Sequence, residues 1–287
     1  MTDKKAGKKS RRKRHHNRHK AKFRMNFGPG FKADMGGKFA KAFVPLAGLA
    51  LAGALSGCNV NYNVGDGVPL DELDIDGATP TEVILASGDI VEIKDGKALK
   101  IKLKGSEEAK EQMRFELDGD ALTISREDND WKGKDPVTVK ITMPTPSKLN
   151  LLGSGSIKAA SIAGDSEIVV AGSGTIDTPN VAAGKLEVNI MGSGTYAAAG
   201  TADSLELNVM GSGAGSMDKL KAGKADVSVM GSGSSSFASD GDVEGSIMGS
   251  GSITVKGGAR CSVSTMGSGK LVCERADSDS DTKDEAA

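Results

Sequence analysis

The chain has few of the residues on which enzyme sites and conventional hydrophobic cores depend. Only 3% of its 287 residues are aromatic, and its three histidines, His15, His16 and His19, all lie near the N-terminus. Residues 42–287 contain no histidine, which excludes a catalytic or metal-binding role for histidine in that part. Glycine is abundant instead, because its 39 residues are about twice the usual share of roughly 7%. This composition indicates a stacked, repetitive core rather than one built on large side chains.

The net charge of −1 hides two segments of opposite charge. Residues 1–41 hold 15 Lys and Arg against Asp3 and Asp34, which gives a net charge of +13. The remaining residues hold 37 − 15 = 22 cations and 38 − 2 = 36 anions, which gives −14. A basic arm on an acidic body is typical of a targeting segment or of a nucleic-acid-binding arm.

No apolar run is long enough to cross a bilayer comfortably, since a spanning helix needs about 20 apolar residues. The shorter uncharged run 42–57 has the character of a secretory h-region, and basic residues precede it. It ends in Leu55-Ser56-Gly57-Cys58, which resembles the lipobox of bacterial lipoprotein signals. The resemblance implies cleavage between Gly57 and Cys58 and a lipid anchor on Cys58. The alternative is a chance cysteine after an uncleaved segment. The residue after this cysteine is Asn59. Because lipoprotein sorting often reads an aspartate at that position as a signal for retention in the inner membrane, Asn59 favours delivery to the outer membrane.

The basic leader, residues 1–41, has two interpretations. In the first, Lys4 to Arg24 form a polybasic arm that binds phosphate groups. In the second, they belong to an overlong n-region, or follow a start codon assigned upstream of the true one at Met35. We favour the second and expect no nucleic-acid partner. Residues 58–79 are expected to form a tether, and the acidic residues 276–287 a disordered tail.

The phrase Gly-Ser-Gly returns at an almost constant spacing from residue 153 onwards. Its successive intervals are 19, 20, 19, 20, 18 and 18 residues, whereas flexible linkers have no fixed period. A period near twenty residues indicates a solenoid, in which each unit stacks on the next. We expect the glycines at the corners of the coils, where tight bends favour a residue without Cβ. These glycines are Gly153, Gly155, Gly172, Gly174, Gly192, Gly194, Gly211, Gly213, Gly231, Gly233, Gly249, Gly251, Gly267 and Gly269.

Apolar and polar residues alternate ahead of each triplet, as in Leu186-Glu187-Val188-Asn189-Ile190. A period of two predicts a strand with one buried face, and a second strand follows each triplet. The predicted fold is therefore all-β, a single-stranded right-handed parallel β-helix with about 18–20 residues per coil and two or three short strands in each. Six further strands are expected before the triplets, to form irregular first coils and cap the stack, at residues 82–85, 90–93, 99–103, 115–117, 122–125 and 137–143.

The order of these segments resembles a known family. Gly88-Asp89-Ile90-Val91, an amphipathic stretch from Glu107 to Phe115, Asp120 to Ile124 and Val139 to Pro144 lead into Leu151-Leu152-Gly153-Ser154-Gly155. The sequence is similar, over about residues 80–273, to the family called "putative auto-transporter adhesin, head GIN domain". The resemblance implies an envelope protein with a β-helix domain, taken here as residues 80–275, and adhesion by analogy. It supplies no catalytic residues.

Cys261 and Cys273 lie six residues before and six residues after the first glycine of the last triplet. Both positions face inward in earlier coils, where Leu205 and Phe237 are examples. Because an exported protein meets an oxidising compartment, we predict a disulfide that closes the last coil, the alternative being two free buried thiols.

A methionine precedes five of the triplets, at Met191, Met210, Met230, Met248 and Met266. Strict alternation would place them on the outside, as an apolar stripe that could bind a partner. If the corner glycines break the alternation, the methionines only fill the edge of the coil, and we favour this interpretation.

The acidic residues Asp177, Glu187, Glu206, Asp226 and Glu244 are expected singly among the outward positions, as solubilising groups. The triplets lack the regular aspartate of calcium-binding repeats, so neither a metal nor another cofactor is expected. We therefore predict a non-catalytic, lipid-anchored envelope protein that binds a polysaccharide or another envelope protein, or has a structural role. A carbohydrate-active β-helix enzyme is the alternative.

Overall fold

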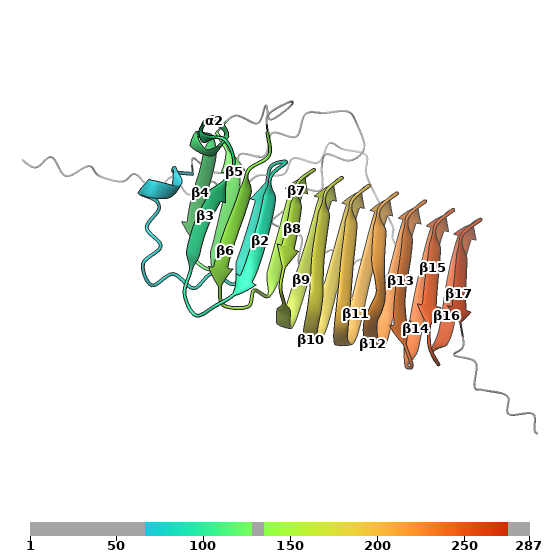
Figure 1. Ribbon diagram of the computed structural model, residues 1–287. Helices are drawn as coiled ribbons and strands as arrows, with labels where there is room; N and C mark the ends of the chain where they lie inside the picture. The colour runs from blue at the N-terminus through green and yellow to red at the C-terminus, as the bar shows by residue number, and fades with distance from the viewer. Residues whose placement is uncertain (1–66, 128–134, 275–287) are drawn as a thin grey trace, which may run out of the picture. The chain divides into compact units, whose positions relative to one another are not determined.

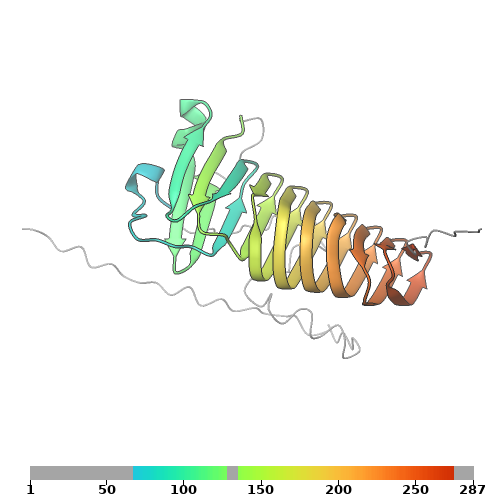
Figure 2. The ribbon, with the colours of Figure 1, turned by 60° about the horizontal axis from the view of Figure 1, so that its bottom comes forward.

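The computed structural model describes residues 67–127 and 135–274, and every structural statement below concerns these residues. The predicted fold class is confirmed, because parallel strands stack coil upon coil into a β-solenoid of about seven turns (Figure 1). Figure 2 shows the coils as a row of arches, with a thicker group of strands at the N-terminal end.

Seventeen strands and two short helices make up this part of the chain. The helices are a 3₁₀-helix, η3 (Leu70–Glu72), and α2 (Glu107–Glu111). The strands before the first triplet are β1 (Glu82–Ala86), β2 (Ile90–Asp95), β3 (Lys100–Lys104), β4 (Met113–Asp118), β5 (Ala121–Arg126) and β6 (Thr138–Met143). The strands of the regular coils are β7 (Lys148–Gly153), β8 (Ser156–Ala159), β9 (Ile162–Gly172), β10 (Thr175–Gly192), β11 (Thr195–Gly211), β12 (Ala214–Gly231), β13 (Ser234–Ser239), β14 (Asp242–Gly249), β15 (Ser252–Lys256), β16 (Arg260–Gly267) and β17 (Lys270–Glu274).

The regular coils stack in the register that the triplets predict. Gly192 pairs with Gly172 on one side and with Gly211 on the other, and the same pairing continues to Gly267. In the middle of the stack the strands are longer than expected, since β10, β11 and β12 each run for 17 or 18 residues. The backbone turns the far corner with only a local register shift, so the expected short strands of a coil merge into one bent strand.

The N-terminal coils are stacked out of sequence order. β1 lies between β5 and β7, and β2 lies between β6 and β8, all in parallel register. The chain therefore builds one coil with β1 and β2, passes outward through β3 and β4, and returns through β5 and β6 on the outer side of that coil. β3 and β4 pair antiparallel with β6 and β5, and form the outer edge together with α2.

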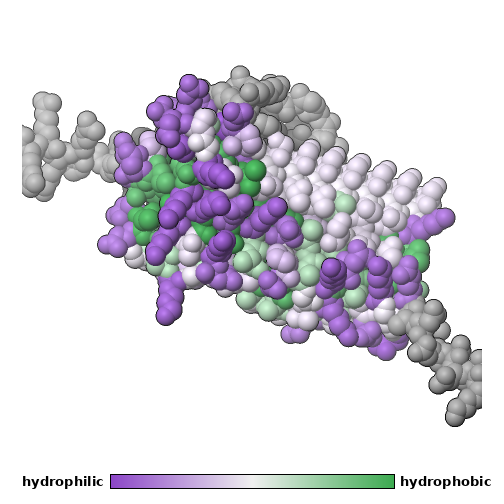
Figure 3. Space-filling view, in the orientation of Figure 1, coloured by the Kyte–Doolittle hydropathy of each residue, from purple (hydrophilic) through white to green (hydrophobic). Residues whose placement is uncertain are grey.

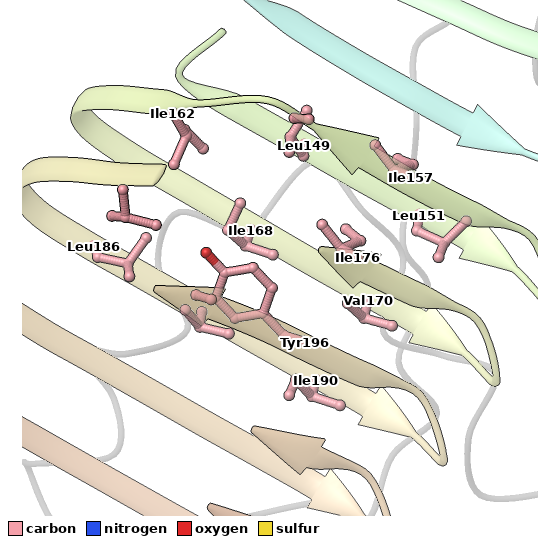
Figure 4. Packing of buried hydrophobic residues seen from close by; sticks show 14 of the residues in the cluster. Leu149, Leu151, Ile157, Ile162, Ile168, Val170, Ile176, Leu186, Ile190 and Tyr196 are labelled. Carbon is pink, nitrogen blue, oxygen red and sulfur yellow. The ribbon is translucent and has the colours of Figure 1, made fainter. Parts of the chain in front are cut away.

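The core is a set of apolar columns that run along the stack (Figure 4). Leu149, Ile168 and Val188 form one column, and Leu151, Val170 and Ile190 form the next; all six are fully buried. The column of Ile157 and Ile176 continues with Tyr196, whose hydroxyl shares a 2.7 Å hydrogen bond with Thr178. Burial raises the pKa of the Tyr196 hydroxyl, so this group stays neutral in the core. Medium-sized side chains in identical positions thus replace the aromatic core that the composition lacks.

Residues 67–79, which were expected to belong to the tether, pack on the domain. Val68 forms a β-bridge with Phe115, and Leu70, Leu73 and Ile75 lie against the core cluster. Their apolar side chains account for this difference, because a free tether would leave them in water. Residues 58–66, the leader 1–41, the apolar run 42–57 and the tail 276–287 lie outside the described residues.

Candidate binding surface

The outward positions of β9–β12, β14 and β16 repeat similar chemistry in most of the coils. Because side chains alternate along a strand and the coils are in register, each outward position becomes a column with a repeat of about 4.8 Å. Three such columns lie side by side ahead of the triplets. We call them the acidic column, the amide–hydroxyl column and the methionine column.

The acidic column consists of one carboxylate in each of five successive coils, five residues before the first glycine of the triplet; Lys148 and Ser262 take this position in the coils before and after them. Its members are Glu167, Glu187, Glu206, Asp226 and Glu244. The sequence predicts acids that stand singly among the outward positions. In the structure four of the five predicted acids lie in one column, each in register with the acid of the neighbouring coil. Asp177 is different and belongs to a column beyond the corner, between Lys158 and Ala197. The constant offset from the triplet is the sequence signal that would have revealed the column.

Lysines partly neutralise the acidic column. Lys185 Nζ lies 3.1 Å from Glu187 Oε2 and 3.0 Å from Glu206 Oε2, so one cation bridges two successive coils. These contacts raise the pKa of Lys185, with the Glu206 hydrogen bond as the largest cause.

Nearer the N-terminus, burial raises the pKa of the Glu82 carboxyl above its usual 4.5; Asp120 and Glu167 add to the rise, whereas Lys148 opposes it. Glycoside hydrolases also use a pair of carboxylates, and for that reason the enzyme alternative is tested below.

The amide–hydroxyl column runs beside the acidic column. Asn208 Nδ2 donates a 3.1 Å hydrogen bond to Asn189 Oδ1, and Asn189 Nδ2 donates a 3.3 Å bond to Glu187 Oε1. The amides are thus held in one orientation along the stack. The column contains Asn150, Val169, Asn189, Asn208, Ser228, Ser246 and Ser264. Asn150, Val169 and Asn189 are buried, with 5%, 2% and 2% exposed, so the column reaches solvent only from Asn208 onwards.

The methionine column borders the triplets. Met191, Met210 and Met230 are half-buried, whereas Met248 and Met266 are exposed. None of the five lies inside the coil, so the alternation of side chains continues up to the corner. The column presents thioether groups next to the amides, which gives the face an apolar edge.

The corner of each coil is shaped by its two glycines. The first glycine of every triplet has a positive φ, between 111° and 140°. A Cβ on the second glycine would meet the preceding coil; at Gly213 it would lie 2.5 Å from Ile190 Cγ2. The middle serines are exposed and form a further column, and Figure 3 shows a pale band of near-neutral residues along this edge.

An eighth corner, which sequence reasoning missed, precedes the seven triplets. Ser87-Gly88-Asp89 lies between β1 and β2, and the Ser87 carbonyl accepts a 3.2 Å hydrogen bond from Gly155 N. Asp89 therefore takes the place of the second glycine and is fully buried. Arg126, from β5, donates to both carboxylate oxygens, at 2.6 Å through Nη2 and 2.9 Å through Nε.

The Asp89 carboxylate has further donors. Ser87 Oγ donates a 2.7 Å hydrogen bond and the backbone N–H of Val137 a 2.8 Å bond. Arg126 Nη2 also donates to the carbonyl of Asp135 at 2.9 Å. With all these groups paired, the cluster is a structural clamp between the first coils, and it offers no free acid or base.

A lysine face lies at the N-terminal end of the stack. Lys102 of β3 pairs with Lys140 of β6, which in turn neighbours Glu92 and, beyond it, Lys158. Hydrophilic side chains gather over β3, β6 and β2 in Figure 3. The face comprises Lys94, Lys100, Lys102, Lys104, Lys140 and Lys158, all exposed. The alternation Lys100-Ile101-Lys102-Leu103-Lys104 was the sequence signal for this face.

Cys261 and Cys273 form a disulfide that joins β16 to β17 in the last described coil, with their Cα atoms 6.6 Å apart. The register places Cys261 beneath Val243, and Cys273 beneath Val255. The bridge ties together the two strands that have no further coil to support them among the described residues.

Removal of this disulfide is expected to destabilise the terminal coil. The double substitution Cys261→Ser and Cys273→Ser should lower the free energy of unfolding by about 3 kcal/mol, because the open chain gains the entropy of a twelve-residue loop. Denaturant titration of both proteins measures the change, with Ser262→Ala as a neighbouring control. Two free thiols in the denatured, unreduced exported protein would contradict the prediction.

Two features bear on membranes and metals. Within the described ranges, no helix is long and apolar enough to cross a membrane. Across residues 67–127 and 135–274, no three side chains among His, Cys, Asp and Glu come together in a metal-binding arrangement. Gly57 and Cys58 lie outside these ranges, so the lipid anchor stays a prediction from the sequence.

Comparisons with known proteins agree with this architecture. The sequence matches the family described as "Putative auto-transporter adhesin, head GIN domain" over residues 79–259. A solved structure of a putative adhesin from Bacteroides fragilis is 19% identical and superposes with a TM-score of 0.60, covering 69% of this chain and 93% of that one. No curated protein matches the sequence.

Two structures from Parabacteroides distasonis share the same fold. One, described as a putative lipid binding protein, is 24% identical, with a TM-score of 0.53, and covers 70% of this chain and 94% of its own. The other, a putative adhesin, is 18% identical, with a TM-score of 0.56, and covers 69% and 93%. At these identities the likeness shows the fold alone.

Proposed function

Because the chain belongs to the family of putative auto-transporter adhesins with a head GIN domain, we propose that it is a lipid-anchored, non-catalytic envelope protein that binds an extended polysaccharide. The observation that carries this proposal is the repetition of the three columns in coil after coil. A surface with a constant repeat fits a partner that is itself extended and repetitive. A polysaccharide is such a partner, as is an elongated envelope protein, which is the second candidate.

The chemistry of the columns favours the polysaccharide. Asparagine amides both donate and accept hydrogen bonds, as sugar hydroxyls do, and serine hydroxyls can adapt to either role. The methionine column adds a flexible apolar edge for the C–H faces of sugar rings. The acidic column and the net charge of −14 over residues 42–287 disfavour polyanions, so the proposed ligand is a neutral or cationic glycan.

Binding to an array of neutral, cationic and anionic polysaccharides tests the proposal. We expect neutral or cationic glycans to be retained, and the pair Asn208→Ala and Ser246→Ala, both half-buried, to reduce retention by about tenfold, as the loss of two net hydrogen bonds would. The control pair Ser216→Ala and Thr254→Ala, beyond the triplet corner, should bind like the unmodified protein. Absence of retention by every glycan would refute the proposal.

The same incubation tests the enzyme alternative. Release of new reducing ends, or of unsaturated sugars, that Glu206→Gln abolishes would establish catalysis and overturn the non-catalytic assignment. Glu206 is the informative position, because Lys185 connects it to Glu187 in the neighbouring coil.

The lipid anchor is a separate part of the proposal. The lysine face supports it, because it lies at the end of the stack where the described chain begins, a few residues after Cys58. Lysines at that end would face the anionic headgroups of the membrane that holds the anchor. Labelling of cells with a fatty acid should mark the full chain but not Cys58→Ser. Equal labelling of both, or of neither, would remove the anchor from the proposal.

A further inference from the structure

The exposed large apolar side chains of the described residues gather at one end of the stack. They are Met248, Val263, Met266 and Val272, with exposed fractions of 42%, 43%, 70% and 45%. All four lie in the last two coils, on β14, β16 and β17. Val263 occupies the inward column that Leu207 and Val227 fill in earlier coils, where both are fully buried. A core position is thus left uncovered at this end.

The backbone at this end is also open. Among the described residues, β16 pairs only with β14, and β17 only with β15. Each strand therefore presents a free edge of N–H and C=O groups, which is a template for another strand. The disulfide holds the two edges in one fixed coil, so the surface is organised in advance of any contact.

Two candidate covers of this end fit poorly. Residues 275–287, which follow β17, contain no apolar residue larger than alanine and cannot bury Val263 or Met266. The N-terminal end of another copy is also unsuitable, because the antiparallel strands β3 and β4 and helix α2 occupy its edge. Head-to-tail stacking of copies would therefore not continue the parallel register of the coils.

We propose that the open end binds the same end of a second copy of this chain, so that two β-helices join end to end about a two-fold axis. The rotation turns the last coil over, and β17 meets the partner's β17 in antiparallel orientation. Centred on Val272, this register places Lys270 opposite the partner's Glu274 and Glu274 opposite the partner's Lys270. Val272 then lies opposite the partner's Val272. These three residues share the outward face because side chains alternate along the strand.

The same axis also suits β16. Ser264 and Val272 are each four residues from Ser268 at the corner, so they lie across the coil from each other. Centred on Ser264, β16 places Val263 opposite the partner's Thr265 and Met266 opposite the partner's Ser262. No two like charges are directly opposed in either strand pair. The sequence of the last coil is therefore complementary to itself in the antiparallel register.

The end-to-end contact does not depend on the lipid anchor or on the glycan. Taken together with the proposed anchor, it has a geometric consequence, since η3 and β17 lie at opposite ends of the described stack. Two joined copies would hold their N-terminal ends far apart, an arrangement suited to contact between two facing membranes.

Thiol cross-linking of the full chain in bacterial cells tests the contact. Val272→Cys treated with a short bismaleimide should give a covalent dimer, because the two thiols would face each other across the axis. Thr254→Cys is the matched control; it precedes Val272 in the same outward column, one coil further inside, and should stay monomeric. Equal cross-linking of the two variants, or none of Val272→Cys, would overturn the proposal.

Charge exchange supplies a second readout that does not rely on a new cysteine. Glu274→Lys opposes two lysines across the axis and should weaken the dimer by about tenfold in sedimentation. Adding Lys270→Glu to the same chain restores opposite charges and should restore the dimer. A monomeric unmodified protein at micromolar concentration, or a double variant no better than the single one, would refute the self-association. Every protein in this experiment also carries Cys58→Ser, so that the measured self-association does not depend on the lipid anchor.

Discussion

Replacement of Asp89 by alanine is expected to lower the free energy of unfolding of the β-helix domain by about 3–5 kcal/mol. Asp89 is fully buried and accepts hydrogen bonds from Arg126, Ser87 and the Val137 backbone. Its loss leaves the Arg126 guanidinium, of which only 3% is exposed, as a buried charge without its counter-ion. Removal of one partner of such a pair costs far more than the pair itself contributes.

Chemical denaturation followed by circular dichroism measures this effect. The exposed pair between Arg260 and Asp242 provides the control, and Asp242→Ala should leave the unfolding midpoint unchanged because solvent already screens that pair. The double variant Asp89→Leu and Arg126→Leu should recover part of the loss, since it removes both charges from the interior. Similar midpoints for Asp89→Ala and Asp242→Ala would show that the buried clamp does not hold the first coils together.

Replacement of Gly211 by alanine is expected to cost about 4 kcal/mol, from two separate sources. Gly211 has a φ of 113°, which L side chains rarely adopt. The added Cβ would also lie 2.5 Å from the Gly192 carbonyl oxygen, which accepts the 2.9 Å hydrogen bond from Ser212 N. The methyl group would therefore strain the bend and push apart two coils at the bond that joins them.

Ser212→Ala is the matched control, one residue away in the same corner. The Ser212 side chain is exposed, so its removal should change stability by no more than about 0.5 kcal/mol. Thermal unfolding of the two variants gives the comparison. If Gly211→Ala were as stable as Ser212→Ala, the triplet glycines would not be required by the geometry of the corner.

Most of the regular stack could be predicted from the sequence. The triplet spacing predicts the register that pairs Gly192 with Gly211, and the alternation from Leu186 to Ile190 predicts which side chains are buried. The acidic column was equally accessible, because each acid stands five residues before its triplet. The column is not visible within a single coil, because only in-register stacking brings the identical positions of successive coils together.

The order in which the N-terminal coils stack could not be predicted from the sequence in the same way. Ser87-Gly88-Asp89 matches the triplet Gly-Ser-Gly at none of its three positions, so the sequence does not mark it as a corner. The strands at residues 82–143 were expected, but nothing in their pattern specified that β5 and β6 return to the outer side of β1 and β2. Periodicity describes the two faces of a strand, whereas its neighbours depend on which edges remain free.

The sequence by itself determined the coil length, the corners and the alternation of inward and outward residues. These are local properties, set by backbone sterics at glycine and by the two-residue period of a strand. The tertiary structure alone decided that Asp89 meets Arg126, 37 residues away, that six lysines share one face, and that the last coil leaves Val263 uncovered. Such features arise from contacts between distant segments, and they depend on the order in which the coils close over one another.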